Sequence, residues 1–320
     1  MSGIFRLCIR FALIGRCQKT VMTPGYGSTM TSDTPILRIG IIADPQYAAI
    51  PPDLDRDRHY AASLDKLRAA IALFNEADLA FVATLGDIID RDWRSFDDVL
   101  PVYDELRHRN VLLLGNHDFS VASEHLSAVA PRIGMPSPYF DFAVAGHRIV
   151  VLDGSDVSLF APPKDDPRRL TASRTLALLS AQGVENAQPW NGALSEAQFA
   201  WLERTLVAAE QAGEAVIVLG HYPVYPGNIN NMWDATRLVE RLTASANFRA
   251  YFCGHNHDGN LGIANGRPFV NFKGMVQTAD TNAFAIVSLY ADRIEIQGFG
   301  REETRLLRLP EMTGRLLSPA

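Results

Sequence analysis

Short apolar runs recur along the chain, and a polar residue closes each of them. These runs occupy residues 36–44, 79–90, 110–118, 147–154, 215–221 and 249–255. Each run is nearly continuous rather than alternating, which is typical of a strand that is buried on both faces. We therefore expect these segments to be buried strands.

Helical patterns lie between these runs. Residues 58–77 and 195–213 carry apolar residues at helical spacing. The second segment has the usual start and end signals, namely a capping box (Ser195 with Gln198), a hydrophobic staple (Leu194 with Phe199) and a terminal Gly213. Further along, residues 267–274, 283–292 and 293–300 are predicted as strands of a meander. Strands that alternate with helices, followed by a run of strands, predict a layered α/β sandwich.

Residues 155–193 interrupt this rhythm. The segment carries prolines and charges and has little strand character. Long insertions in a compact domain are often binding loops, and the alternative is a solvated surface excursion. We expect an N-terminal extension over residues 1–34, a single domain with this insertion over 35–310, and a tail over 311–320.

The N-terminal extension is basic up to its first acidic residue, Asp33. Arg10 interrupts its apolar stretch, which is unfavourable for the hydrophobic region of a signal peptide. We favour a dispensable extension over a weak organelle-type presequence.

Composition narrows the class of protein. The chain has 320 residues with 47% hydrophobic and 21% charged residues, which is ordinary for a globular enzyme. A net charge of −6 argues against non-specific binding to nucleic acid, and no apolar run is long enough to span a membrane. Three cysteines make no disulfide framework, which favours a reducing, cytoplasmic location. We expect a monomer that acts on a small molecule.

Polar residues gather directly after the predicted strands. They are Asp44, Gln46, Asp87, Asp90, Asn116, His117, Asp118, His221, His255 and His257. Binding sites of open α/β sheets form beyond the carboxyl ends of the strands, where such side chains meet. Glycines 86, 115, 220 and 254 suit tight turns that direct the following side chain inward.

The pair His255 and His257 points to a metal. Side chains two residues apart in an extended segment lie on the same face, so both imidazoles can reach one region. Histidine is the commonest metal ligand in proteins. From this stretch alone, a solvated loop that happens to hold two histidines is the alternative.

The order of these motifs resembles the calcineurin-like metallophosphoesterase superfamily. That pattern is D-x-H, G-D-x-x-D, G-N-H-[DE], a single His and G-H-x-H. This chain departs at the first motif, which reads Asp44-Pro45-Gln46. With this departure, the chain is similar to one subfamily, the manganese-dependent ADP-ribose/CDP-alcohol diphosphatases. The segments that carry this similarity are "IADPQYA", "LGDIIDR", "WNGALSEAQFAWL", "GHNHDG" and "NFKGMVQTADTNAFAIVSLYADRIEIQGFGR". The resemblance covers roughly residues 38–301 and fades between about 155 and 185.

The resemblance implies an α/β/β/α sandwich of two mixed sheets flanked by helices, with two divalent metal ions. The first ion would take Asp44, Gln46, Asp87 and His257, and the second Asp87, Asn116, His221 and His255. Gln46 would supply an amide oxygen in place of an imidazole, and harder oxygen sites suit Mn²⁺ better than nitrogen-rich sites do. We therefore expect Mn²⁺, with Zn²⁺, Fe²⁺ and Mg²⁺ as the alternatives. In the alternative interpretation, Gln46 binds no metal and one ion is lost.

The implied reaction is hydrolysis of the diphosphate in nucleoside diphosphate conjugates. ADP-ribose would give AMP and ribose 5-phosphate, and CDP-alcohols would give CMP and a phospho-alcohol. The alternatives are a cyclic-nucleotide phosphodiesterase or phosphomonoesterase with the same two metals, or a scaffold without catalysis. His117 would neutralise charge on the phosphoryl oxygens or protonate the leaving group, and Asp90 would orient it. Asp118 would be a cap or a loop anchor.

Other polar and aromatic residues are assigned to the structure rather than to the site. We expect surface or packing positions for His59, His108, His125 and His147, and a buried packing position for Cys253. Arg168 and Arg169 are predicted to be a solvated charge pair. Trp190, Trp233 and Tyr222, which lie near the motifs together with Asn191, could stack on a base or pack in the core.

Overall fold

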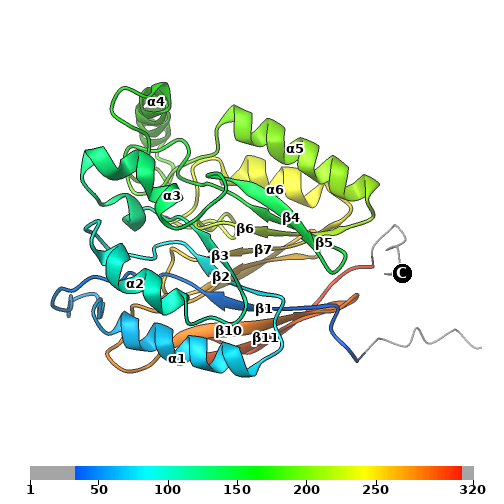
Figure 1. The fold of residues 1–320 in the computed structure, drawn as a ribbon. Helices are drawn as coiled ribbons and strands as arrows, with labels where there is room; N and C mark the ends of the chain where they lie inside the picture. Colours follow the sequence, from blue (N-terminus) through cyan, green and yellow to red (C-terminus); the bar gives the residue numbers. More distant parts are fainter. Residues whose placement is uncertain (1–32, 312–320) are drawn as a thin grey trace, which may run out of the picture. The chain divides into compact units, whose positions relative to one another are not determined.

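The computed structural model describes residues 33–311. This part of the chain forms two six-stranded sheets that pack face to face, with helices on their outer faces (Figure 1). The predicted α/β/β/α sandwich of two mixed sheets is thereby confirmed. The predictions for residues 1–32 and 312–320 lie outside the described residues.

The first sheet has the order β12-β11-β10-β1-β2-β3. Its strands are β1 (Leu37–Ile42), β2 (Phe81–Leu85), β3 (Arg109–Leu113), β10 (Ala283–Leu289), β11 (Arg293–Gly300) and β12 (Arg305–Arg308). Strands β1, β2 and β3 run parallel to one another, whereas β10, β11 and β12 form an antiparallel meander beside β1. The loops after β1, β2 and β3 therefore leave the sheet at the same edge.

The second sheet has the order β4-β5-β6-β7-β9-β8. Its strands are β4 (Phe140–Val144), β5 (His147–Val151), β6 (Ala215–Leu219), β7 (Phe248–Cys253), β8 (Asn260–Ala264) and β9 (Arg267–Asn271). The four central strands are parallel, and β4 and β8 close the edges in the antiparallel direction.

Helices cover the outer face of each sheet (Figure 1). The first sheet carries α1 (Ser63–Glu76), α2 (Ser95–Tyr103), α3 (Val129–Arg132) and the short 3₁₀ helices η1 (His117–Phe119) and η2 (Ser123–Ala128), and the second carries α5 (Glu196–Gln211) and α6 (Ala235–Thr243). Helix α4 (Pro167–Ala181) belongs to the insertion. No helix within residues 33–311 is long and apolar enough to cross a membrane.

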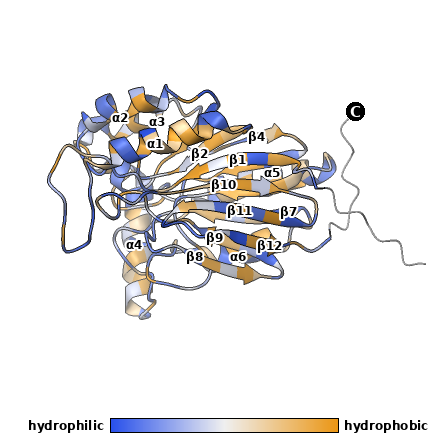
Figure 2. Ribbon diagram, turned by 90° about the horizontal axis from the view of Figure 1, so that it is seen from below, coloured by the Kyte–Doolittle hydropathy of each residue, from blue (hydrophilic) through white to orange (hydrophobic). Residues whose placement is uncertain are grey.

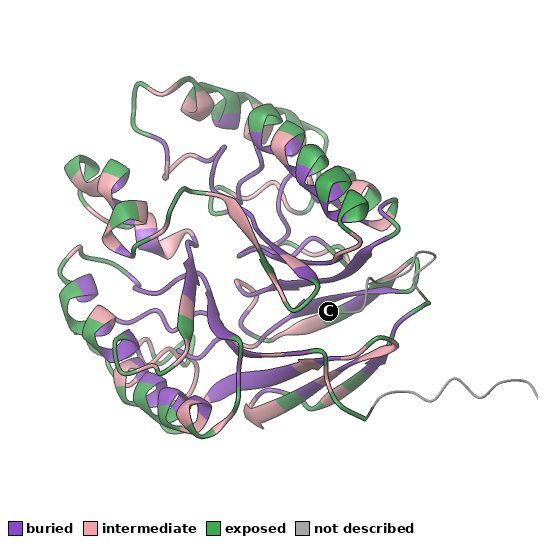
Figure 3. Cartoon of the chain, turned by 45° about the vertical axis from the view of Figure 1, so that its right-hand side comes forward, coloured by how far each residue is buried: buried purple, intermediate pink, exposed green. Residues whose placement is uncertain are grey.

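Apolar side chains on both faces of the strands hold the layers together. Figure 2 shows the hydrophobic residues along the strands. In β1, Ile39 and Ile41 pack between the two sheets, whereas Ile42 packs toward the helices. A Cβ on Gly40 would lie 2.9 Å from the ring of Phe74 in α1, so a glycine here lets the helix approach the strand closely. The nearly continuous apolar runs in the sequence reflect this two-sided burial, which Figure 3 shows as buried strands beneath half-exposed helices.

The sequence predictions for β9 and for the start of α5 need correction. Residues 267–274 were expected in the meander, but β9 lies in the other sheet, parallel to β7. The capping box is only half formed. Ser195 Oγ accepts a hydrogen bond from the backbone of Gln198, but the Gln198 side chain bonds to Asp153 and Asp156 instead of returning to the helix start.

The insertion is more ordered than its composition indicated, because it contains helix α4. The prediction that Arg168 and Arg169 are a solvated pair is wrong. Arg168 forms ion pairs with Asp156 and Asp166, both at 2.7 Å, and the Arg169 guanidinium donates to the carbonyl of Leu159. These bonds fold the insertion onto itself because partly buried guanidinium groups need acceptors.

Asp234, directly before α6, gives a test of the buried electrostatics. Its Oδ2 accepts a 3.3 Å hydrogen bond from Leu194 N, while its Oδ1 is shielded from solvent and has no partner. Burial raises the pKa of Asp234 to about 7. The folded state therefore keeps a proton that the unfolded chain releases at about pH 4, so this group stabilises the fold below pH 4 and loses its contribution as pH rises to 7.

We expect Asp234→Asn, which imitates the protonated side chain, to unfold like the parent protein at about pH 4 and to be more stable by up to about 4 kcal/mol at pH 8. Urea denaturation at both pH values measures this difference. A variant that is less stable than the parent at pH 8 would contradict the assignment.

Candidate metal centre

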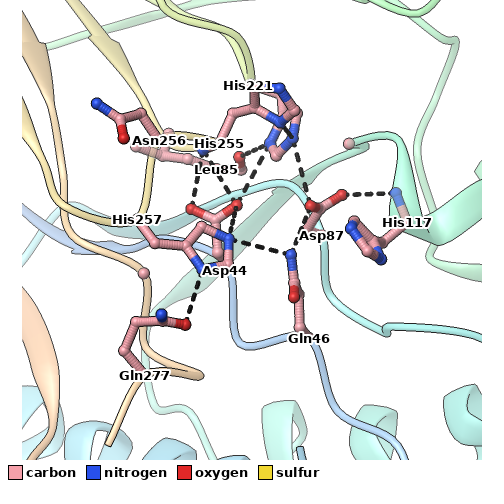
Figure 4. A network of polar contacts seen from close by, with 12 residues as sticks. Asp44, Gln46, Leu85, Asp87, His117, His221, His255, Asn256, His257 and Gln277 are labelled. Carbon is pink, nitrogen blue, oxygen red and sulfur yellow. Dashed lines mark hydrogen bonds and ion pairs between the residues drawn. The ribbon is translucent and has the colours of Figure 1, made fainter. Parts of the chain in front are cut away.

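The loops that follow the parallel strands of both sheets meet at one edge of the sandwich. Asp44 and Gln46 follow β1, Asp87 follows β2 and Asn116 follows β3. From the second sheet, His221 follows β6, and His255 and His257 follow β7. Figure 4 shows the carboxylates, the imidazoles and Gln46 directed toward one another. The chain thus brings together residues that are far apart in the sequence.

These side chains form two groups that share Asp87. In the first group, ligand atoms of Asp44, Asp87 and His257 all lie within 4.8 Å of one another. The Nε2 atom of Gln46 lies 2.9 Å from Asp87 Oδ2 and 3.1 Å from His257 Nε2. The side chains of Asp44, Gln46, Asp87 and His257 are all buried.

The second group contains Asp87, His221 and His255, again within 4.8 Å. His221 Nε2 is 3.1 Å from His255 Nδ1, 3.2 Å from Asn116 Oδ1 and 3.5 Å from Asp87 Oδ2. His255 and His257 therefore belong to different groups. The structure brings the seven residues together as the sequence analysis expected, and their coordination of metal ions stays a prediction.

Burial changes the ionisation of the histidines in a direction that suits metal binding. It lowers the pKa of His257 to about 3, with a smaller effect from the charge of Arg58, and it lowers the pKa of His221 and His255 as well. All three imidazoles are therefore neutral at physiological pH. A neutral imidazole has a free lone pair, which is the form that binds a metal ion.

The two carboxylates respond differently to burial. Burial, together with the charge of Asp87, raises the pKa of Asp44 well above its ordinary value. Burial also raises the pKa of Asp87, but electrostatic interactions with the His221 and His117 imidazoles and a backbone hydrogen bond from His117 outweigh this effect, so the pKa of Asp87 is lowered. Two buried carboxylates this close repel each other unless a cation lies between them.

The residues present fit divalent cations. Carboxylate and amide oxygens together with imidazole nitrogens are the donors that manganese accepts. The Oε1 atom of Gln46 is buried and has no hydrogen-bond partner. A half-turn of this amide exchanges its nitrogen and oxygen and directs Oε1 toward Asp87 and His257. Gln46 is thus compatible with an oxygen ligand of the first group.

Several of these residues have a backbone conformation that is rare for side chains other than glycine. The φ angles of Asp44, Gln46, Asp87 and His255 are 48°, 43°, 52° and 69°. Such strained conformations cluster at functional sites, where the surrounding structure enforces them. Here they turn the side chains inward from the strand ends.

The glycines beside the site leave room for its carboxylate side chains. Of the glycines at 86, 115, 220 and 254, only Gly86 has a positive φ, so the conformational freedom of glycine is needed at that position alone. A Cβ on Gly115 would lie 2.2 Å from Asp87 Oδ1, and one on Gly254 would lie 2.5 Å from Asp44 Oδ2. No larger residue fits beside these carboxylates without displacing them.

Comparison with known proteins agrees with this geometry. Residues 37–259 match the calcineurin-like phosphoesterase family. The chain belongs to this family. It is 30% identical to the manganese-dependent ADP-ribose/CDP-alcohol diphosphatase of Xenopus tropicalis, over 86% of this chain and 95% of that protein. The protein of the same name from Arabidopsis thaliana is 25% identical, over 84% of this chain and 96% of that protein.

A solved structure resembles the phosphoesterase domain over its whole length. It is the crystal structure of a dimetal phosphatase from Danio rerio, with a TM-score of 0.77 and 26% sequence identity. The match covers 86% of this chain and 100% of that chain. A purple acid phosphatase from yellow lupin shares the fold at 12% identity, with a TM-score of 0.58.

His117 stands beside the two groups of this phosphoesterase site. Its Nδ1 lies 3.0 Å from Asp90 Oδ1, and its backbone N donates a 2.8 Å hydrogen bond to Asp87 Oδ1. Burial lowers the pKa of His117, but the charges of Asp87 and Asp90 outweigh this effect and raise it. The side chain is 25% exposed and lines the cleft described below. His117 can therefore present a proton to a molecule bound there.

Asp118 is a loop anchor, which is one of the roles considered for it. Its two carboxylate oxygens accept hydrogen bonds from Ile89 N at 3.1 Å and Gly115 N at 2.9 Å. Burial, with the charge of Asp87 added, raises the pKa of Asp118 to about 8. The residue joins the loops after β2 and β3.

A cleft of about 690 Å³ opens over the two groups. Besides the residues of the site, its lining includes Arg56, Arg58, Trp190, Asn230 and Gln277. Neither arginine was assigned to the site from the sequence. Arg58 fell within the helix predicted over 58–77, whereas α1 begins at Ser63, and Arg56 lies just before that segment. Two prolines and alternating charges directly after the first motif were the available signal of a loop.

The structure assigns the residues whose roles the sequence left open. Trp190 is 39% exposed and lines the cleft, whereas Tyr222 and Trp233 are buried in the hydrophobic core. Asn191 is fully buried and contacts His255, which the sequence analysis did not foresee. The insertion therefore contributes Trp190 and Asn191 to the site.

The histidines and the cysteine outside the motifs have local partners. His59 pairs with Asp57, His108 bonds to the carbonyl of Phe74, His125 stacks on Trp93, and His147 bonds to the carbonyl of Ala145. Cys253 packs in the core between the second sheet and its helices. These positions agree with the packing and surface roles expected for them.

We expect His117→Ala to lower the turnover number by about 10²–10⁴-fold, because a proton donor and a positive charge are lost from the cleft. The bound metal, measured by elemental analysis, should be unchanged, since the seven predicted ligands remain. Asp90→Asn should cause a smaller loss of the same kind. Unchanged turnover in His117→Ala would remove this residue from the reaction.

Gln46→His should change the metal preference of the first group. An added imidazole makes the donor set richer in nitrogen, which favours Zn²⁺ relative to Mn²⁺. Metal content after dialysis against equal concentrations of the two ions measures this shift. Gln46→Glu, which retains an oxygen donor, is the control and should keep the preference for Mn²⁺. Identical metal ratios in both variants would show that residue 46 does not contact the ion.

Proposed function

We propose that this protein is a manganese-dependent hydrolase that cleaves the diphosphate of nucleoside diphosphate conjugates. ADP-ribose would give AMP and ribose 5-phosphate, and CDP-alcohols would give CMP and a phospho-alcohol. The observation that carries this proposal is the pair of buried ligand groups that share Asp87 and open into a cleft with two arginines. The names of the relatives from Xenopus tropicalis and Arabidopsis thaliana support the substrate class and the metal.

Seven residues would hold the ions. Asp44, Gln46, Asp87 and His257 would take the first, and Asp87, Asn116, His221 and His255 the second. When bound, two divalent cations supply Lewis-acid charge that activates water and neutralises phosphoryl oxygens. The carboxylate of Asp87 belongs to both ligand groups and would therefore set their separation.

His117 would act on the leaving group. Asp90 holds the Nδ1 proton of His117, and this contact leaves Nε2 as the atom that can donate a proton into the cleft. The raised pKa of His117 keeps a larger fraction of the imidazole protonated near neutral pH. A proton placed on the oxygen of the departing phosphate makes that product a better leaving group.

The rest of the cleft suits a nucleoside diphosphate better than a simple monoester. Arg56 and Arg58 offer positive charge for the phosphate that is not attacked. A guanidinium group can donate two parallel hydrogen bonds to the oxygens of one phosphate. Trp190 presents a partly exposed ring on which a base can stack. A volume of about 690 Å³ is within the usual range for sites that bind small molecules.

Product analysis tests the proposal. Metal-stripped protein, reconstituted with Mn²⁺, is incubated with ADP-ribose, CDP-choline, cyclic AMP, p-nitrophenyl phosphate and a diribonucleotide. We expect AMP from ADP-ribose or CMP from CDP-choline at rates well above those for the other substrates. Asp87→Asn should be inactive on the whole panel, because both ligand groups lose their shared carboxylate.

Other outcomes would redirect the proposal. Preference for cyclic AMP or p-nitrophenyl phosphate would retain the two-metal site but replace the diphosphate substrate with a cyclic nucleotide or a monoester. Mn²⁺ binding without turnover on any substrate would indicate a scaffold that has lost catalysis.

A further inference from the structure

Each of the three histidines in the candidate metal centre has one ring nitrogen facing the other ligands and one facing away. A neutral imidazole carries a proton on only one nitrogen, so the outward contact decides which nitrogen keeps a lone pair for a cation. Contacts with groups that can only accept a hydrogen bond identify the protonated nitrogen. The structure provides such a contact for each ring.

His221 is the simplest case. Its Nδ1 lies 2.8 Å from the carbonyl oxygen of Leu85, which can only accept, so Nδ1 carries the proton (Figure 4). Its Nε2 therefore has the lone pair, and it faces Asn116 and His255.

His257 depends on a side-chain amide. Its Nδ1 lies 2.9 Å from Gln277 Oε1 (Figure 4). The orientation of this amide is fixed, because Gln277 Nε2 donates a 2.8 Å hydrogen bond to the carbonyl of Arg56, which has no proton to give. His257 must then carry its proton on Nδ1, and its Nε2 lone pair faces Gln46 at 3.1 Å and Asp44 Oδ1 at 3.6 Å.

The loop that carries Gln277 is itself tied to a helix. Lys66 in α1 donates hydrogen bonds from Nζ to the carbonyls of Met275 at 3.1 Å, Gln277 at 2.7 Å and Thr278 at 2.5 Å. Because the ammonium group satisfies three neighbouring carbonyls, the backbone at Gln277 is held in place and the amide can orient His257.

His255 depends on Asn191 in the same way. Its Nε2 lies 3.2 Å from Asn191 Oδ1, and Asn191 is fully buried. The Nδ2 of Asn191 donates to the carbonyls of Asn186 at 3.0 Å and Ile229 at 2.8 Å, which fixes the orientation of the amide. His255 therefore carries its proton on Nε2, and its Nδ1 lone pair faces His221 Nε2.

We infer that Gln277 and Asn191 are positioning residues for the two cations, one for each ion. Gln277 directs the lone pair of His257 into the first ligand group, and Asn191 directs that of His255 into the second. This inference rests on the two-ion site of the proposed function and adds to it the residues that set the histidine tautomers. It also gives the insertion a role in the metal centre.

Mn²⁺ affinity measures these roles without reference to turnover. Free Mn²⁺ is followed by electron paramagnetic resonance during titration of metal-free protein. We expect Gln277→Leu to lower the affinity for one of the two Mn²⁺ ions by about 10–100-fold and to leave the affinity for the other unchanged. Asn191→Leu should instead lower the affinity for the second ion. Gln188→Leu is the matched control, because the Gln188 side chain donates a hydrogen bond to the carbonyl of Glu185 and contacts no histidine of the site, while its backbone bonds are retained in the variant. It should bind both ions like the parent protein.

Double variants separate positioning from a general loss of structure. If Gln277 acts through His257, adding Gln277→Leu to His257→Ala should weaken Mn²⁺ binding no further, whereas adding it to His255→Ala should give the full loss. The converse holds for Asn191→Leu, which should have no added effect in His255→Ala. Gln277→Glu, which keeps an oxygen facing Nδ1, should retain most of the affinity.

Nitrogen chemical shifts of labelled histidines in the metal-free protein test the tautomers directly. His257 should carry its proton on Nδ1 in the parent protein and shift toward Nε2 in Gln277→Leu. Two results would overturn the inference. One is an equal loss of affinity for both Mn²⁺ ions. The other is a further loss when Gln277→Leu is added to His257→Ala, or when Asn191→Leu is added to His255→Ala.

The two proposals fail in different ways. The expected Mn²⁺ affinities without cleavage of ADP-ribose or CDP-choline would overturn the proposed substrates and support the positioning roles. Cleavage of those substrates, with the affinity for both Mn²⁺ ions unchanged in Gln277→Leu and Asn191→Leu, would support the proposed substrates and overturn the positioning roles.

Discussion

The carboxylate of Asp87 is the constraint on which the site depends. It is fully buried at the end of β2, and it belongs to both ligand groups. Three contacts hold it: the backbone N of His117, the amide of Gln46 and the imidazole of His221. The loop after β3 passes so close that only a glycine fits at position 115. A shift of this one side chain would therefore change the geometry of both ligand groups. It would also displace the segment that carries His117.

Much of this arrangement could be predicted from the sequence. The central strands are buried on both faces, so their apolar runs are long enough to stand out, and the polar residue after each run marks the loop at the site. The strands that were missed, β4, β8 and β12, lie at sheet edges and are only partly buried. Their sequences, FDFAV, NLGIA and RLLR, lack the long continuous apolar run that marks a central strand.

The outer contacts of the site could not be predicted. Gln277 reaches His257 across 20 residues of chain, and Asn191 reaches His255 across 64 residues, with no spacing that marks either pair. An amide that orients an imidazole looks like any other amide in a sequence, because its role depends on where the backbone carbonyls around it lie. Arg58 was hidden for a different reason, since a helical pattern was extended over the end of the loop that brings it to the cleft. Arg56 lies just before that segment, where no motif marks it.

The origin of the ligands has a consequence for the fold. The predicted oxygen ligands Asp44, Gln46, Asp87 and Asn116 all come from loops of the first sheet, and the three imidazoles all come from loops of the second. Each ligand group therefore spans the boundary between the two halves of the sandwich. A cation bound there would cross-link two layers that otherwise adhere through apolar contacts and a few hydrogen bonds, such as that of His221 to Leu85. Its binding energy would then also become cohesion between the layers. The two kinds of donor atom are separated along the same boundary. The first sheet supplies the oxygen donors, which are harder ligands, and the second sheet supplies the imidazole nitrogens, which are softer.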